Sequence, residues 1–287
     1  MAGIDVNTTT LTLPSEVSTV IMQKLQEDSA VMTLAQSMEL PGLGATIPVI
    51  TGDPEASWVS ETNEKPVARP GLSTKIMQPY TLAVIVPFSN QFRNNVPSLY
   101  EAVVSRLPMA LAQKFDATVF GAVAAPGTNF DTLDTATAQA FTNPWEALVA
   151  ADQAVAEAGG ITNGYIISPQ AKAKLLTAMD GNGRPLFVNS TSEGGVPMLL
   201  GSPTIQRKAA YVESGVTSAE KAIAFAGDWT QAIYGVAQAL NVSISDQATL
   251  TDGDATINLW QRNMFAVRAE IEVGFVADTK CFAKFTV

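Results

Sequence analysis

The residues best suited to chemistry begin with Ser218 and Lys221, which have the S-x-x-K spacing of serine acyl-enzymes. In such enzymes a neighbouring base activates the serine as a nucleophile. Ser245-Asp246-Gln247 partly matches the second element of that class, but glutamine stands where asparagine is needed. The third element, K-T-G, occurs nowhere in the sequence. A four-residue pattern arises easily by chance, so we interpret this match as a coincidence.

Carboxylates in two other patterns suggest metal binding or glycoside hydrolysis. The sequence DGNGRP begins like a calcium loop at Asp180, but Arg184 replaces an oxygen ligand and no matching glutamate follows, so we predict a glycine-rich turn. Carboxylates two residues apart, which a glycosidase could use, more often share one wet or paired face of a strand. These pairs are Asp53 with Glu55 and Glu270 with Glu272.

The composition excludes most catalytic chemistry. The chain has no histidine and only one cysteine, Cys281, so it can form neither a serine-histidine pair nor a zinc site of histidines or thiolates. Its net charge of −10 disfavours a sequence-independent grip on nucleic acid, because phosphates would be repelled. We predict that the protein is not an enzyme and uses no metal or other cofactor.

The surface is expected to be covered by other copies of the chain. Charged residues make up 15% of the 287 residues, whereas a soluble monomer has about 25%. Neither of the long uncharged stretches, 76–92 and 229–245, resembles a membrane-spanning helix, since prolines or amide side chains interrupt them. The start MAGIDVN lacks the features of a signal peptide, so we expect the chain to stay in the cytosol where it is made.

Residues 1–44 are predicted to form an N-terminal arm that contains an amphipathic helix. Apolar residues recur near helical spacing from Pro14 to about Met38, and Asp28-Ser29 can restart the helix. The apolar positions are Val17, Val20, Ile21, Leu25, Val31, Leu34 and Met38.

Residues 45–88 are predicted to form one long β-hairpin, because strand-like ends enclose a middle rich in Pro, Gly, Glu and Lys. Trp58 lies in this middle, far from any expected core. A large indole on a projecting segment usually fills a pocket, and we expect that pocket to belong to a neighbouring copy. The charged residues near Trp58 are Glu61, Glu64, Lys65 and Arg69.

A long helix and an inserted lobe follow. Ser98 and Glu101 form a capping box that predicts a helix ending at Gly121. A second helix is predicted from Asn143 to Gly159-Gly160, then a strand YIIS and a helix from Pro169 to about Met179. This alternation indicates a compact α/β lobe at 143–249.

The segment NMFAVRAEIEVGF, from Asn263 to Phe275, is predicted to be a strand with two unlike faces. Its apolar face should pack on the core and carries Val267, Ala269, Ile271, Val273 and Phe275. Its charged face carries Arg268, Glu270 and Glu272, and could meet water, a ligand or another protein.

Several phrases, in this order, resemble the major capsid proteins of tailed bacteriophages. They are ASWVSE in the hairpin, DGNGRPL and AFAGDWTQAIYG in the lobe, and LWQRNMFAVRAEIEVGFVADTKCFAKFTV at the end of the chain. The resemblance covers nearly the whole chain. It implies an α+β Hong Kong ninety-seven type fold with an N-terminal arm, a long β-hairpin as extended loop, a peripheral domain with a spine helix, and an inserted α/β axial domain. The peripheral domain would comprise 89–142 and 250–287, and the axial domain 143–249.

The resemblance further implies a shell protein that forms the hexamers and pentamers of an icosahedral container for double-stranded DNA. The charged face would then be an interface with a neighbour's hairpin, whose cations match its carboxylates. Alternatives are an encapsulin-like nanocompartment shell, or an oligomeric hydrolase with carboxylate or lysine chemistry. The residues expected at the interface are Trp58, Glu61, Lys65, Arg69, Lys75, Arg268, Glu270 and Glu272.

Partners and a covalent bond also follow from the resemblance. Many relatives begin with a scaffolding segment that is removed, whereas this chain enters its arm soon after Met1, so we expect a separate scaffolding protein, together with a portal and a decoration protein. Assembly would take place in the bacterial cytoplasm, and the chain would end in the virion capsid. Some relatives join a hairpin lysine to a neighbour's asparagine, for which Lys65 or Lys75 with Asn258 or Asn263 are the candidates.

Overall fold

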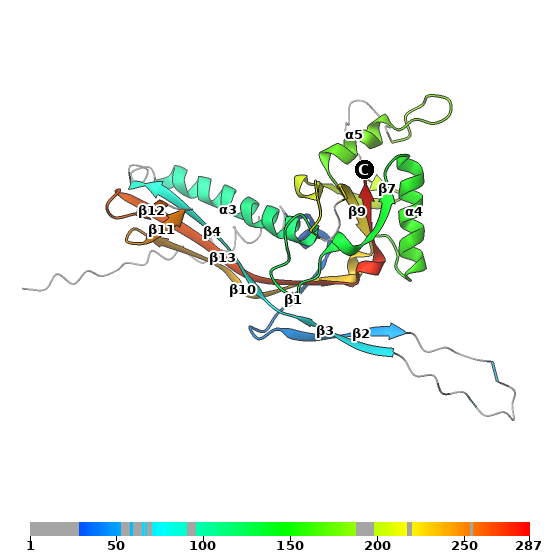
Figure 1. Cartoon of the computed structure of the whole chain (residues 1–287), viewed down its shortest axis with the longest axis horizontal. Coiled ribbons are helices and arrows are strands. Elements are labelled where there is room, and N and C mark those ends of the chain that lie inside the picture. Colours follow the sequence, from blue (N-terminus) through cyan, green and yellow to red (C-terminus); the bar gives the residue numbers. More distant parts are fainter. Residues whose placement is uncertain are drawn as a thin grey trace, which may run out of the picture.

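The computed structural model describes residues 29–52, 58–59, 65, 67, 71–90, 96–187, 198–216, 220–252 and 255–287. It shows an elongated sheet with a long helix beside it, a lobe at one end, and a two-stranded hairpin that projects from the body (Figure 1). The chain therefore combines helices and strands in segregated layers, as an α+β fold does.

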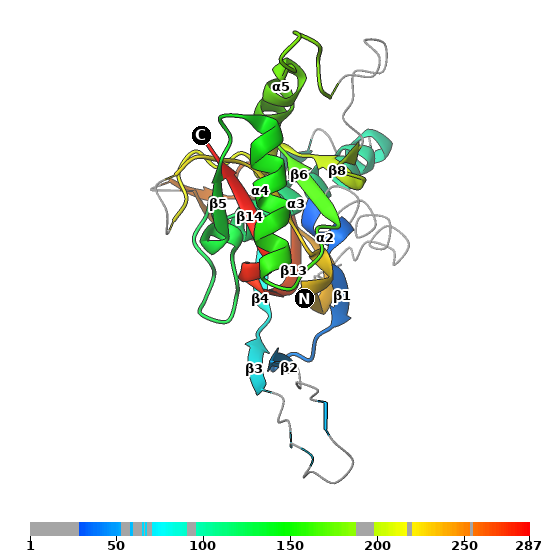
Figure 2. The same cartoon turned by 90° about the vertical axis from the view of Figure 1, so that its right-hand side faces the viewer.

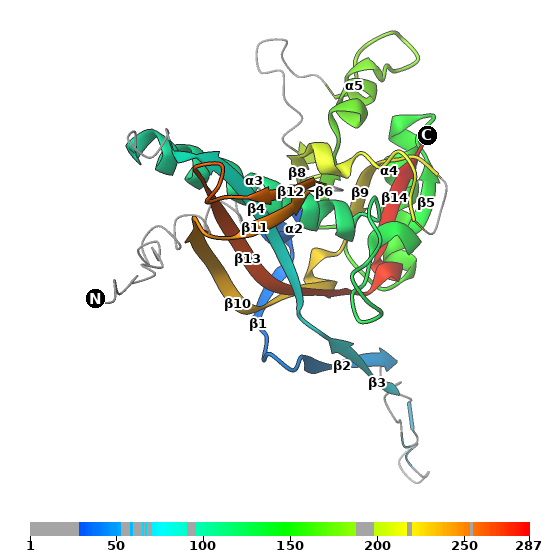
Figure 3. The same ribbon diagram turned by 60° about the vertical axis from the view of Figure 1, so that its left-hand side comes forward.

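The elongated part is a four-stranded sheet in the order β1-β10-β13-β4. β1 runs parallel to β10, whereas β13 is antiparallel to both β10 and β4. The long helix α3 lies along one face (Figure 3). The elements are β1 (Gln36–Glu39), β4 (Tyr80–Ser89), β10 (Ala232–Ser245), β13 (Met264–Ala277) and α3 (Val96–Val119).

β13 has the two faces that its sequence predicts. All five residues of the apolar face are buried in the main core, which also contains four of the described side chains of α3. Phe275, for example, lies 6.3 Å from Phe115 of α3 between ring centres, in an edge-to-face arrangement. The helix residues are Leu107, Leu111, Phe115 and Val119. The face that carries Arg268 points away from this core.

The lobe is built on a six-stranded sheet in the order β5-β14-β9-β6-β8-β7. Helix α4 lies across the lobe (Figure 2) and, together with α5, supplies apolar side chains to one face of its sheet. The main core covers the other face, where Phe120 stacks on Phe225. The elements are β5 (Thr137–Ala140), α4 (Pro144–Glu157), β6 (Gly164–Ile167), α5 (Pro169–Thr177), β7 (Met198–Leu199), β8 (Ser202–Gln206), β9 (Ala222–Gly227) and β14 (Phe282–Thr286).

The other elements are two small hairpins and several short helices. Two further hairpins pair β2 (Ala45–Gly52) with β3 (Gly71–Met77), and β11 (Thr249–Asp252) with β12 (Ala255–Asn258). The remaining elements are α2 (Ala30–Leu34), η2 (Leu133–Thr135), η3 (Lys208–Ala210), η4 (Trp229–Gln231) and η5 (Thr279–Cys281). Among the described residues, no helix is both long and apolar enough to cross a membrane.

The predicted domain boundaries need adjustment where strands pair over long sequence separations. β10 falls within 143–249 but pairs with β13 in the elongated sheet. β14 falls within 250–287 but pairs with β5 and β9 in the lobe. The chain therefore enters the lobe at about Thr137, leaves it before Ala232, and returns to it with its last strand.

The predicted single hairpin at 45–88 is in fact divided. β2 pairs with β3 from Ala45 opposite Met77, whereas Tyr80–Ser89 pairs with β13 in the sheet. Pro79 separates the two strands in the sequence. A proline lacks the N–H that a continuous ladder would need, which favours a break at this point.

Helix boundaries agree with the sequence to different degrees. α4 follows Asn143 and is closed by Gly159 at φ +84°, as predicted. α3 begins at Val96, so Ser98 lies inside the helix and the predicted capping box is wrong. Gly121 does end it at φ +81°, where a Cβ would collide with Asp134.

The predicted helix at Pro14–Met38 lies mostly outside the described residues. Ser29 caps α2 through its side chain, which accepts a hydrogen bond from the Met32 amide, so the helix restarts where the sequence indicates. The prediction is wrong after Leu34, because Gln36–Glu39 form β1. Pairing with β10 outweighs the helical spacing of these few residues.

Candidate assembly surface

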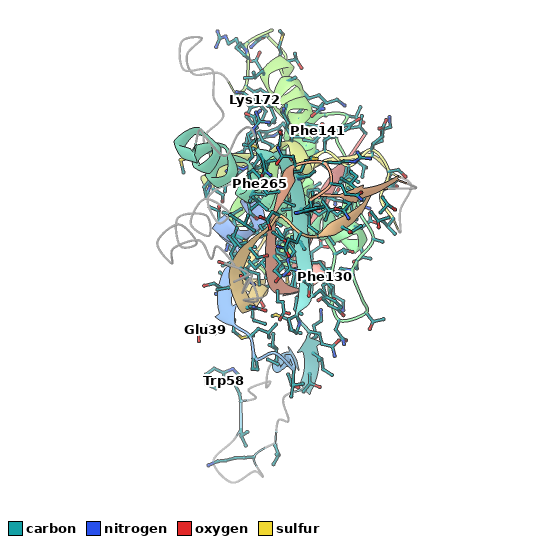
Figure 4. All side chains as sticks on the ribbon, turned by 90° about the vertical axis from the view of Figure 1, so that its left-hand side faces the viewer. Glu39, Trp58, Phe130, Phe141, Lys172 and Phe265 are labelled. Carbon is teal, nitrogen blue, oxygen red and sulfur yellow. The ribbon has the colours of Figure 1, made fainter. Side chains whose placement is uncertain are left out.

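The sequence-predicted interface residues lie at two separate places in the fold. The β2–β3 hairpin projects from the body, and Trp58, at 105% relative exposure, lies far out along it (Figure 4). Lys65 and Val67 are also exposed. Glu61 and Arg69 lie outside the described residues. A large exposed indole on a projecting hairpin can anchor a contact when a partner buries it in a pocket.

A pair of glycines seats the base of this hairpin on the sheet. Gly235 of β10 and Gly274 of β13 are register partners, and Met77 at the end of β3 is completely buried against them. A Cβ on Gly235 would stand 2.7 Å from Met77 Sδ, and one on Gly274 would stand 2.8 Å from Met77 Cγ and 2.7 Å from the Gln78 carbonyl oxygen. Only glycine leaves room for so close an approach.

An apolar cluster surrounds this seat. Leu40, Met77 and Val276 are buried and form its centre. Both β1 and the beginning of β2 contribute, so the cluster joins hairpin and sheet. The partly buried members are Met38, Ala45, Ile47, Ile233 and Ala237.

A polar clamp adds to the apolar cluster. Lys75 Nζ donates to Asp131 Oδ2 at 2.8 Å and to the Ala277 carbonyl oxygen at 2.8 Å. Asp131 Oδ2 also accepts the Ala277 amide at 3.1 Å. Lys75, which the sequence suggested as a charge for a neighbouring copy, therefore has partners in its own chain and fixes β3 to the end of β13.

Replacing Lys75 and replacing Asp131 should lower the free energy of unfolding by different amounts. Lys75→Met should lower the free energy of unfolding by less than about 1 kcal/mol, because the ion pair is partly exposed. Asp131→Ala should lower it by about 1–2 kcal/mol, since the Ala277 amide also loses its acceptor. Urea unfolding of the unassembled chain, followed by tryptophan fluorescence, measures both. A larger loss for Lys75→Met than for Asp131→Ala would contradict this description.

The charged face of β13 forms a short polar network on the sheet. Arg268 donates to Glu270 Oε1 at 3.2 Å, and Asn241 Nδ2 donates to the same oxygen at 3.1 Å. Glu272 is half-buried. In the ladder Arg268 lies beside Ile85, a large apolar side chain that is 47% exposed. Ile85 is therefore a large apolar side chain exposed on the same face of the sheet as the charged network.

The two asparagines proposed for a covalent bond lie at the other end of the sheet. β12, which ends at Asn258, is far from β2 and β3 in every view (Figures 1 and 3). Asn263 Oδ1 accepts from Asn90 Nδ2 at 2.7 Å, and Asn258 Oδ1 accepts from the Gln261 amide at 3.1 Å. A bond to Lys65 or to Lys75 would have to join different copies, and it stays a prediction.

Sequence reasoning missed several exposed apolar residues, of which Trp260 and Leu43 are two. Trp260, at 76% exposure, follows β12 at the end opposite the hairpin, and Leu43, at 97%, lies in the turn before β2. It also missed the glycine seat. Two glycines inside strand-like segments, Gly235 and Gly274, were the available signal, because glycine within a strand often marks a close backbone approach.

The residues considered for chemistry form no reactive site in the described structure. Asp180 Oδ1 accepts the amides of Asn182 and Arg184 at 2.9 and 2.8 Å, so this segment is a turn, as predicted. Ser218 lies outside the described residues. Cys281 is buried, and burial, with Asp278 and Asp228, raises the pKa of its thiol. The described residues contain no cluster of three or more potential metal-ligating carboxylates or thiols.

Comparison with known proteins agrees with this fold. The sequence model of the Phage capsid family matches residues 9–286. The "Probable major capsid protein gp17" of Mycobacterium phage L5 is 29% identical over 280 residues, which cover 90% of this chain and 84% of that protein. The "Major capsid protein" of Staphylococcus phage 80alpha is 25% identical over 291 residues, 95% of this chain and 84% of that protein. A solved chain from Microbacterium phage Oxtober96 has a TM-score of 0.74 at 19% identity, and 90% of each chain is covered.

Proposed function

The chain belongs to the phage capsid family, and we propose that its copies form hexamers and pentamers of an icosahedral shell through the seated hairpin of each copy. Members of this family are structural proteins rather than enzymes, and this chain is a major capsid protein of a phage. As a capsid protein, it is a component of the virion. The shell would enclose packaged double-stranded DNA.

The observation that carries the proposal is the contrast between the two ends of the hairpin. At its base, the glycine seat, the apolar cluster and the Lys75 clamp fix its direction. Farther out, Trp58 has no cover from its own chain. A fixed direction reduces the entropy lost on docking, and a free indole supplies a large buried contact. A hairpin of this kind is suited to reaching a neighbouring copy.

The charged network on β13 would set the register between copies. Exposed ion pairs contribute only about 0–1 kcal/mol each, so most of the affinity must come from apolar contacts such as those of Trp58 and Ile85. Complementary charges chiefly select the correct partner and orientation. In the proposed contact, Lys65 and Arg69 of one hairpin face Glu270 and Glu272 of a neighbour.

Charge reversal at Arg268 tests this contact. Arg268→Glu should leave the chain folded, because the side chain is 48% exposed and its pairing with Glu270 contributes little. It should block shell formation, since it replaces the cation that would face Glu61 of a neighbour's hairpin with a carboxylate, and like charges in a contact repel each other. Arg268→Lys, which keeps the charge, is the matched control and should assemble. Electron micrographs of the two variants give the answer, and intact shells from Arg268→Glu would refute the contact.

The net charge of −10 is compatible with a DNA container. An acidic wall does not bind phosphates, so DNA can be packed densely without adhering to the shell. We further propose assembly in the bacterial cytoplasm with a separate scaffolding protein, a portal and a decoration protein. A covalent bond between Lys65 or Lys75 and Asn258 or Asn263 of a neighbour belongs to the same proposal.

The alternatives receive no support from the described residues or the relatives. The relatives named above are phage capsid proteins, which favours a genome container over an encapsulin-like compartment. The phage capsid family, to which this chain belongs, consists of structural proteins, which disfavours a hydrolase.

A further inference from the structure

A small apolar cavity opens between α3 and the first residues of β4, with a volume of about 140 Å³. Part of its lining is buried and part is exposed, so the cavity has a closed floor and an open mouth. The buried lining residues are Phe115, Thr118, Phe130 and Val273. The exposed ones are Thr81, Lys114, Ala124 and Pro126.

Aromatic contacts fix the shape of this cavity. Phe130 lies 6.3 Å from Phe115 and 6.3 Å from Tyr80 between ring centres, edge to face in both cases. The segment that leads to Phe130 lies directly on Tyr80, because a Cβ added to Gly127 would collide with the Tyr80 ring. An apolar cavity of about 150 Å³ in another protein binds benzene, so this cavity can hold the six-membered ring of an indole.

The cavity also offers what the polar edge of an indole needs. A buried indole N–H usually finds a hydrogen-bond acceptor. Thr81 and Thr118 both line the cavity, and a threonine hydroxyl has lone pairs that can accept. Thr118 Oγ1 donates its own proton to the Lys114 carbonyl oxygen at 2.9 Å, which leaves its lone pairs for an incoming donor.

Two of the exposed tryptophans differ in how well they suit this cavity. Lys114 is the charged residue among the described lining residues. Residues 53–64, which surround Trp58, contain four carboxylates and no lysine or arginine, so they complement Lys114. Trp260 is followed by Arg262, which would be repelled. Trp58 lies on the projecting hairpin and Phe130 in the body (Figure 4), so the indole that fills the cavity must come from another copy.

We propose that this cavity receives the Trp58 indole of a neighbouring copy. The inference rests on the shell contact proposed above and names its receptor. Lys114 then faces Glu55 of the incoming hairpin and lies beside the indole as a cation–π partner. Thr81 is the register partner of Glu272, so the receptor adjoins the charged face of β13. One hairpin can therefore place Trp58 in the cavity and Lys65 beside Glu272.

Cross-linking in assembled particles tests the receptor. Val59→Cys keeps Trp58 and places a thiol next to it, and Ala124→Cys places a thiol at the mouth of the cavity. The native Cys281 is buried and does not compete. In particles of the double variant, a short bismaleimide reagent should convert most of the monomer band of a denaturing gel into multimers. Val59→Cys with Val149→Cys, whose second thiol lies on α4 of the lobe, is the matched control and should stay monomeric.

The outcome separates the receptor from the shell. Particles of the double variant that still run as monomers after treatment would overturn the assignment of the cavity and leave the proposed shell intact. A wild-type chain that forms no particles would refute the proposed function, and the receptor with it.

A second variant decides the question if the double-cysteine chain does not assemble. Ala124→Trp covers the mouth of the cavity from an exposed position, so it should leave the fold intact and lose assembly as far as Trp58→Ala does. Combining Ala124→Trp with Trp58→Ala should cause no further loss, because both remove the same contact. Ala124→Ser is the control and should assemble normally. Light scattering measures all four chains, and wild-type assembly by Ala124→Trp or additive losses would contradict the receptor.

Discussion

Replacing residues 47–75 with Asn-Gly should leave a folded protein that no longer assembles. Thr46 and Ile76 are register partners, so a two-residue turn can close the shortened ladder while Met77 keeps its seat. Among the described residues between 47 and 75, none belongs to either of the two large cores. The body should keep its circular dichroism spectrum and unfold cooperatively, because the contacts that the described residues of this segment lose belong to the Lys75 clamp and to the edge of the small cluster.

The loss of assembly should be complete, because the truncation removes Trp58 and both hairpin cations of the proposed contact, Lys65 and Arg69. Trp58→Ala, which keeps the length of the hairpin, is the companion variant and should weaken assembly by at least 2 kcal/mol per contact, as the loss of an interface hot spot does. Size-exclusion chromatography with light scattering measures both variants beside the wild type. Normal particles from the truncated chain would mean that copies meet through some other surface.

Gly274→Val should displace the base of the hairpin from the sheet and thereby impair assembly. The added Cβ would stand 2.7 Å from the Gln78 carbonyl oxygen and 2.8 Å from Met77 Cγ, and a backbone oxygen cannot move without moving β3. Overpacking of this kind costs about 1–3 kcal/mol of stability. Because Met77 fixes the direction of the hairpin, assembly should fall further than the stability loss alone would cause.

The matched control is Gly42→Val, in the turn before β2. A Cβ at Gly42 meets nothing within 4 Å, so this variant should unfold and assemble like the wild type. Denaturant unfolding and light scattering of the two variants distinguish a local effect on the seat from a general intolerance of valine. If Gly274→Val has wild-type stability and assembly, the glycine seat does not control the hairpin.

Local patterns predicted the local structure well. The alternation in Val267–Phe275 identified the buried face of β13, because side chains two residues apart share a face whatever the strand pairs with. Asn143 and Gly159 marked the two ends of α4: Asn143 stands at the N-cap before Pro144, although its side chain makes no capping hydrogen bond, and Gly159 adopts the left-handed conformation after the last turn. Ser29 marked the start of α2, because its side chain caps the helix by accepting a hydrogen bond from the Met32 amide.

Pairing over long separations could not be predicted in this way. Nothing in Tyr80–Ser89 shows that it pairs with β13 rather than with β2, and nothing in Phe282–Thr286 assigns it to the lobe. Such choices depend on which edges remain free once the whole chain has folded. The helical spacing up to Met38 failed for the same reason, since β10 offered an edge to Gln36–Glu39.

The candidate surface was predicted in part. Trp58 could be recognised because a large apolar residue stood in a polar, turn-rich segment, and it is exposed. The role of Lys75 could not be recognised, because its partner Asp131 is 56 positions away. The burial of Asp116 of α3 against Ser29 and Ala30, away from this surface, was also missed, since a carboxylate in an amphipathic helix gives no sign in the sequence that a second helix will bury it.

The most direct test is a cryo-EM reconstruction of the assembled particle. The central claim is that the β2–β3 hairpin is fixed at Met77 and ends on another copy. The reconstruction should show residues 45–77 crossing to an adjacent subunit, with the Trp58 indole buried there and Lys65 near a neighbour's Glu270 or Glu272. Density that places Trp58 against its own body, with the charged face of β13 open to solvent, would contradict the claim.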